Sequence, residues 1–113
     1  MTFEPGTIVL VPFPYTNLRA TKHRPAVVLS RRAYNEASAD VVVCAMTSNL
    51  MDAAHSVLVS QRDLIEGHLP MDSRVKADKV ATLERSMMRA IGRLRPGILE
   101  QVYRETFSVL GRN

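Results

Sequence analysis

Short runs of β-branched apolar residues dominate this chain up to residue 83 and limit what it can fold into. Four such runs span residues 7–13, 25–30, 40–47 and 56–60. A fifth, over residues 73–83, places Val75, Ala77 and Lys79 on one face and Lys76 and Asp78 on the other. Runs of this length, bounded by Gly, Pro and Ser, predict β-strands. The sequence therefore predicts a mainly β protein.

Helical signals follow the strands. Residues 60–63 have a capping-box pattern, and Gly67 offers a stop for a short helix over residues 64–66. A longer C-terminal helix is predicted, with Pro96 in its first turn and Gly111 just past its end. Its apolar face, which favours packing in the core or in a dimer, consists of Ile98, Leu99, Val102, Thr106, Val109 and Leu110. Several short strands and one closing helix predict a small, strongly curved antiparallel barrel.

The length of 113 residues suits one hydrophobic core, so we expect a single domain over residues 1–113. The chain has no apolar run long enough to cross a bilayer and no signal-peptide pattern, which predicts a cytoplasmic protein without membrane partners. Its net charge of +4 favours polyanionic partners. The few aromatic residues, three Tyr, three Phe and no Trp, disfavour an RNA reader that relies on aromatic stacking.

Metal and thiol chemistry have little support in the sequence. Cys44 is the only cysteine and lies within an apolar strand, where a buried thiol is a better interpretation than a nucleophile. His23, His55 and His68 have no metal-ligand spacing. We therefore predict no metal and no cofactor.

Polar groups gather at the ends of two predicted strands. Arg24 precedes Pro25, which biases it towards an extended conformation, and Thr47 ends the run 40–47. If these strands are neighbours, the two side chains lie together. An arginine fork suits a reacting phosphate, but arginine and threonine are poor proton carriers, which leaves His23 and Asp78 as candidates. A surface ion pair, a turn cap and a solvated loop residue are the alternatives for these positions.

Four stretches of the chain, in order, resemble the MazF/PemK toxin family. They are residues 6–13 (GTIVLVPF), 23–30 (HRPAVVLS), 40–48 (DVVVCAMTS) and 73–83 (SRVKADKVATL). The resemblance implies an SH3-like curved barrel of the CcdB/PemK type with a C-terminal helix, working as a homodimer. It also implies a type II toxin that cuts single-stranded RNA without a metal, leaving a 2′,3′-cyclic phosphate and a 5′-hydroxyl.

The resemblance assigns roles to individual residues. Arg24 and Thr47 match the family's best supported catalytic positions. Asp78 matches the aspartate of an Arg-x-Asp pair, whose arginine is Lys76 in this chain, and Lys79 replaces the usual glutamine. The loop from Tyr15 to His23 corresponds to the connection beside the RNA groove. The RNA-binding residues expected on this basis are Tyr15, Thr16, Arg19, Lys22, Ser48, Asn49 and Lys76.

The same basic groove is expected to attract the acidic tail of a cognate antitoxin. Two rival functions are a CcdB-like gyrase poison and a non-catalytic SH3-like binding module. The gyrase poisons rely on a tryptophan near the C-terminus, which this chain lacks. The presence of Arg24 and Thr47 argues against the non-catalytic module.

Overall fold

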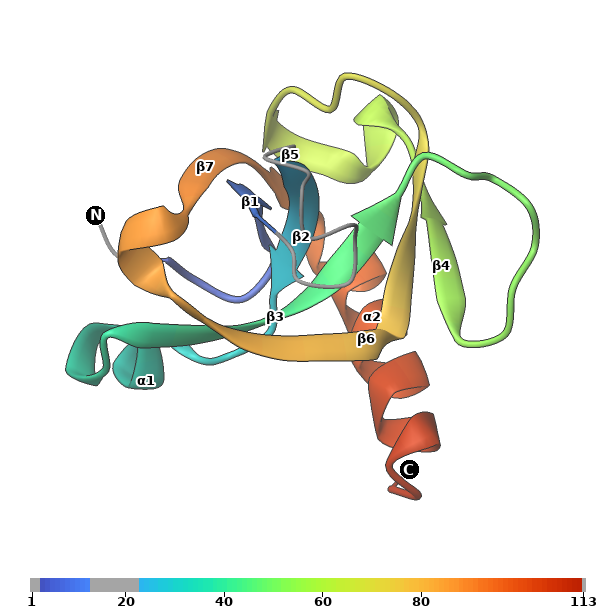
Figure 1. Cartoon of the computed structure of the whole chain (residues 1–113). Helices are drawn as coiled ribbons and strands as arrows, with labels where there is room; N and C mark the ends of the chain where they lie inside the picture. Colours follow the sequence, from blue (N-terminus) through green and yellow to red (C-terminus); the bar gives the residue numbers. More distant parts are fainter. Residues whose placement is uncertain (1–2, 13–22, 113) are drawn as a thin grey trace.

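The computed structural model describes residues 3–12 and 23–112. In these residues seven strands form one sheet in the order β4-β6-β3-β2-β1-β7-β5, antiparallel at every pairing. The sheet curls into a half-barrel, and helix α2 packs against β6 and β4 (Figure 1). This architecture confirms the predicted fold class, a mainly β, SH3-like curved barrel with a C-terminal helix.

The strands are β1 (Thr7–Val11), β2 (Arg24–Val28), β3 (Asp40–Thr47), β4 (Ser56–Val59), β5 (Leu64–Gly67), β6 (Ser73–Glu84) and β7 (Arg89–Leu94). The helical elements are α1 (Arg32–Ala37), the 3-10 turns η1 (Gln61–Asp63) and η2 (Arg85–Met87), and α2 (Pro96–Val109). All five strands expected from the sequence and the C-terminal helix are present, with small differences at their ends. Across residues 3–12 and 23–112, the helices are too short or too polar to span a bilayer.

The short helix predicted over residues 64–66 is wrong. The capping box is present, since Asp63 Oδ2 accepts the backbone N–H of Ser60 at 2.8 Å, but it closes the 3-10 turn η1. The chain then extends as β5, whose Leu64 is buried and which pairs with β7. The sequence predicted neither β7 nor α1, because neither segment has a clear apolar period.

Apolar side chains pack on both faces of the sheet. One group, which includes Ile8 and Cys44, packs between the sheet and Val102 of α2. The other, which includes Val41 and Val43, covers the opposite face. Successive residues of β3 alternate between the two groups, as the pleat of a strand requires.

The predicted apolar face of the C-terminal helix is only partly buried. Val102 and Thr106 are buried, and Thr106 Oγ1 donates a hydrogen bond to the backbone oxygen of Ala77 at 3.0 Å. Val109 and Leu110 are exposed instead, because the helix extends beyond the edge of the sheet (Figure 1). The helix thus anchors β6 through its middle turns and leaves its last turn uncovered in the monomer.

Candidate active site

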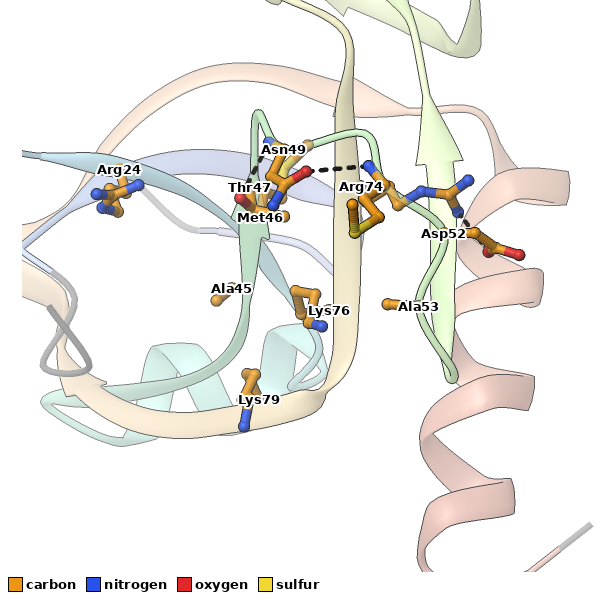
Figure 2. A pocket seen from close by; sticks show the side chains of 11 residues that line it. Arg24, Ala45, Met46, Thr47, Asn49, Asp52, Ala53, Arg74, Lys76 and Lys79 are labelled. Carbon is orange, nitrogen blue, oxygen red and sulfur yellow. Dashed lines mark hydrogen bonds and ion pairs between the residues drawn. The ribbon is translucent and has the colours of Figure 1, made fainter.

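The two polar strand ends identified in the sequence lie together. Strands β2 and β3 are neighbours, with Ala26 opposite Ala45, so Arg24 at the start of β2 and Thr47 at the end of β3 reach the same region. Both line a cavity of about 620 Å³. Its other polar lining residues are Asn49, Asp52, Arg74, Lys76 and Lys79. Figure 2 shows Arg24 and Arg74 on opposite sides of Thr47.

Part of the Arg24 guanidinium is buried and lacks a hydrogen-bond partner within the described residues. Arg24 opens β2 directly before Pro25, in the extended conformation that a following proline favours. Its Nε is buried, and no acceptor in the described part of the chain hydrogen-bonds to it. A buried donor without a partner costs about 1–3 kcal/mol. An anionic oxygen bound at this position would remove that cost.

Thr47 and Asn49 shape the turn that leaves β3. Thr47 Oγ1 accepts the backbone N–H of Asn49 at 3.1 Å, and Asn49 Oδ1 accepts that of Met51 at 3.0 Å. Thr47 therefore caps the turn, as the alternative interpretation held. Its hydroxyl hydrogen is not used in that bond and can still donate to an oxygen in the cavity.

A bulge in β6 changes which charged residues face the cavity. Lys76 lies opposite Ala45 and Val80 opposite Cys44, so residues 77–79 are extra on the β6 side. The extra residues break the alternation, and Lys79 lines the cavity beside Lys76. Asp78 does not line it. The expectation that Lys79 shares a face with Val75 and Ala77 is therefore wrong, because the bulge places Lys79 beside Lys76 at the cavity.

Cys44 is a buried residue of β3 whose thiol is affected by the charge of Asp78. Burial raises the pKa of the Cys44 thiol to about 12, and the negative charge of Asp78 adds to this rise, while a hydrogen bond to the Val27 backbone opposes it. Cys44 belongs to the core group that packs against α2. The buried, protonated thiol agrees with the interpretation of Cys44 as a core residue.

Arg74 belongs to the cavity although the sequence analysis did not select it. It lies opposite Thr47 in the β3–β6 pairing. Its Nε donates to Leu50 O at 3.0 Å and its Nη1 to Ser56 Oγ at 3.2 Å, and Nη1 lies 3.6 Å from Asp52 Oδ1. The guanidinium thus braces the loop between β3 and β4. Arg74 lies two residues before Lys76, so a strand places both side chains on the same face. This spacing was the signal in the sequence that could have identified Arg74.

The remaining predicted residues lie beside the cavity or outside the described structure. His23 and Ser48 are exposed and line a smaller adjoining cavity that also contains Arg24. Tyr15, Thr16, Arg19 and Lys22 lie outside the described residues. Among residues 3–12 and 23–112, no three His, Cys, Asp or Glu side chains lie close enough to hold a metal ion.

The charge of the cavity suits an anionic ligand. Four cationic side chains line it, those of Arg24, Arg74, Lys76 and Lys79, against the single carboxylate of Asp52. The Asp52 side chain is 92% exposed, so water screens much of its charge. A phosphate group carries the charge and the several acceptor oxygens that these donors can bind.

The curled half-barrel with a C-terminal helix is the fold of solved MazF structures. The profile of PemK-like, MazF-like toxins of type II toxin–antitoxin systems matches residues 4–108, and the chain belongs to this family. A sequence comparison with curated proteins finds no match.

Solved structures agree with this assignment. MazF of Deinococcus radiodurans has a TM-score of 0.76 and 25% identity to this chain, with 98% of each chain covered. The same toxin in a MazE–MazF complex has a TM-score of 0.75 and 26% identity, with 98% of this chain and 97% of that chain covered. A mycobacterial endoribonuclease in complex with its cognate antitoxin has the same fold, with a TM-score of 0.78, 21% identity and coverage of 96% and 95%.

Proposed function

We propose that this chain is a metal-independent endoribonuclease that cuts single-stranded RNA at specific sequences. The observation that carries the proposal is the cavity where Arg24, Thr47 and three further cations meet, in a member of the PemK/MazF family. A similar mycobacterial protein is itself named an endoribonuclease. Single-stranded RNA suits such a site because its backbone and splayed bases are accessible together.

In the proposed reaction, the 2′-oxygen of the RNA attacks the adjacent phosphorus. The bond from phosphorus to the 5′-oxygen breaks, which leaves a 2′,3′-cyclic phosphate and a 5′-hydroxyl. Arg24 stabilises the charge that develops on the phosphate oxygens, and Thr47 donates to one of them. Asn49 and Lys76 position the neighbouring backbone as RNA-binding residues.

One proton must leave the 2′-hydroxyl and one must reach the 5′-oxygen. Histidine ordinarily titrates near neutrality, and His23 lies directly before Arg24 in the chain. Asp78 does not line the cavity, although its neighbour Lys79 does. His23 or a water molecule is therefore the better candidate for proton transfer.

The proposal extends to partners. The cationic cavity would attract the acidic segment of a cognate antitoxin, and relatives of this chain have been solved with their antitoxins. We also propose a homodimer, because the last turn of α2 exposes Phe107, Val109 and Leu110, and pairing would bury such apolar surface.

Cleavage of single-stranded RNA in the presence of EDTA tests the proposed function. Mass spectrometry of the products is expected to find 2′,3′-cyclic phosphates and 5′-hydroxyls. Arg24→Ala is expected to abolish cleavage while circular dichroism and the oligomeric state stay as in the wild type. RNA that stays intact at high enzyme excess, across varied sequences, would sink the proposal. Near-full activity of Arg24→Ala would show that the site is assigned wrongly.

A further inference from the structure

A second, smaller cavity of about 230 Å³ adjoins the candidate active site, and we call it the apolar slot. It shares Arg24 and Met46 with the larger cavity. Its far wall comes from the segment between β5 and β6, with Leu69, Pro70 and Met71. A ligand that bridges the two cavities would therefore pass directly beside the Arg24 guanidinium.

The slot is apolar, with a few polar groups at its edges. Met46 and Leu69 are buried walls, whereas Met71 is 61% exposed and lies at the rim. Ser73 Oγ donates to the backbone oxygen of Met71 at 3.0 Å, and its lone pairs can accept a further hydrogen bond. Apolar walls with a few oriented polar groups are typical of sites for planar organic ligands.

The size of the slot limits what it can hold. Pockets for drug-sized ligands measure about 300–1,000 Å³, so 230 Å³ suits a single ring system rather than a whole nucleotide. Pro70 and Met71 offer flat or polarisable apolar surface, and a methionine sulfur makes favourable contacts with aromatic rings. Arginine guanidinium planes also stack on unpaired bases.

We propose that the apolar slot receives one unstacked nucleobase of the RNA whose phosphate lies against Arg24 and Thr47. This inference rests on the proposed function, and it assigns the slot as a site of base recognition. A nucleobase is joined to its phosphate through one ribose, so its subsite must adjoin the phosphate site. The shared Arg24 provides that continuity.

Binding of short 2′-O-methyl RNA oligomers tests the slot without cleavage, because the methylated 2′-oxygen cannot attack the phosphate. The probes are oligo-A, oligo-C, oligo-U, oligo-I and an abasic oligomer of the same length. In the wild type, at least one base-bearing oligomer is expected to bind about fivefold tighter than the abasic one. Met71→Ala is expected to lose most of this margin, which is the difference in affinity between base-bearing and abasic oligomers. Its binding of the abasic oligomer, and the salt dependence of that binding, are expected to stay unchanged.

Met51→Ala is the matched control. Met51 is 78% exposed and lines the larger cavity but not the slot, so its variant is expected to keep the margin. The slot assignment is overturned if wild type and Met71→Ala have equal margins, or if Met51→Ala loses the margin instead. Equal binding of base-bearing and abasic oligomers by the wild type also overturns it.

Cleavage of unmodified RNA, measured in parallel, separates the two claims. A protein that shows the Met71-dependent margin but leaves RNA intact keeps the base site and loses the nuclease. A protein that cuts RNA without the margin keeps the nuclease and loses the base site. Absence of both binding and cleavage by the wild type overturns both.

Discussion

Lys79, not its neighbour Asp78, faces the candidate active site, because the bulge in β6 reverses the expected alternation. A lysine contacts phosphate as a point charge, and each phosphate contact releases counterions from the RNA. The position of one bulge thus sets the charge of the cavity. It also places Lys79 beside Lys76, whereas the sequence pattern placed Lys79 on the face of Val75 and Ala77.

Lys79→Ala should weaken binding of 2′-O-methyl RNA and make it less sensitive to salt. The slope of log affinity against log salt should fall by about 0.7 for the lost contact with a single strand. Asp78→Asn is the neighbouring control and should leave the slope unchanged. Fluorescence anisotropy over a series of salt concentrations measures both. A slope altered by Asp78→Asn and not by Lys79→Ala would show that the two side chains were assigned to the wrong faces.

Arg74→Ala should loosen the loop that carries Asn49 and Asp52. Two hydrogen bonds from Arg74 hold this loop, to Leu50 O and Ser56 Oγ, and their loss should destabilise the protein by about 1 kcal/mol. RNA cleavage should fall about tenfold or more, because the groups lining the cavity lose their alignment.

Arg74→Lys separates charge from geometry at this position. Lysine keeps the positive charge but lacks the planar fork that bonds Leu50 and Ser56 together. Its cleavage rate and urea unfolding should resemble those of Arg74→Ala. Full activity in Arg74→Lys would mean that only the charge matters and that the bracing contacts contribute nothing.

At the scale of elements, the pairing of β5 with β7 depends on a close backbone approach. Gly67 has φ of +86°, and a Cβ there would lie 2.2 Å from Ile91 O and 2.3 Å from the Gly92 Cα. No side chain fits against backbone at such distances. The edge of the half-barrel is therefore built around two glycines that face each other.

Gly67→Ala should destabilise the protein by about 2 kcal/mol or more, because it combines a clash with an unfavourable backbone conformation. Gly97→Ala is the matched control, since a Cβ at Gly97 meets no atom within 4 Å. Gly97 lies in α2, so alanine there should be neutral or stabilise by about 0.5 kcal/mol or more. Urea unfolding measures both. Equal stability of the two variants would contradict the close approach.

The sequence predicted β3 and α2 well because their signals are local. Seven apolar or β-branched residues in a row, from Val41 to Thr47, define β3, and Pro96 and Gly111 bound α2. In contrast, Leu64 and Ile65 follow a capping box, which is typical of a helix start. Pairing with β7 outweighed that local preference, and a pairing between distant segments leaves no local pattern in the chain.

At the scale of the whole molecule, two titratable side chains, Tyr103 of α2 and Cys44 of β3, lie in or against the core group between the sheet and α2. Tyr103 Oη donates to Leu29 O at 2.5 Å, and the Cys44 thiol lies in the core group beneath the helix. Burial raises the pKa of Tyr103, with added effects from the charges of Glu100 and Cys44, and burial also raises that of Cys44. The folded state is therefore favoured when the Tyr103 hydroxyl and the Cys44 thiol are both protonated.

Stability should therefore be lost at alkaline pH. The contribution of Cys44 is complete below its ordinary pKa of 9.0 and is lost as the pH rises towards about 12. That of Tyr103 is lost above its ordinary value of 10.0. Thermal unfolding from about pH 8 to about pH 11 should show a falling Tm. Cys44→Ala should make that fall shallower, and an equal fall in this variant would exclude the thiol.

The sequence by itself determined the mainly β class and the C-terminal helix, and it placed Arg24 and Thr47 at the ends of two strands that the structure shows to be neighbours. Residue order along a strand sets which faces are apolar, and neighbouring strands bring their ends together. Only the tertiary structure decided the β5–β7 pair, the cavity position of Lys79 and the loop contacts of Arg74. A bulge or a distant pairing is chosen by the packing of the whole sheet, so each segment taken alone is compatible with more than one outcome.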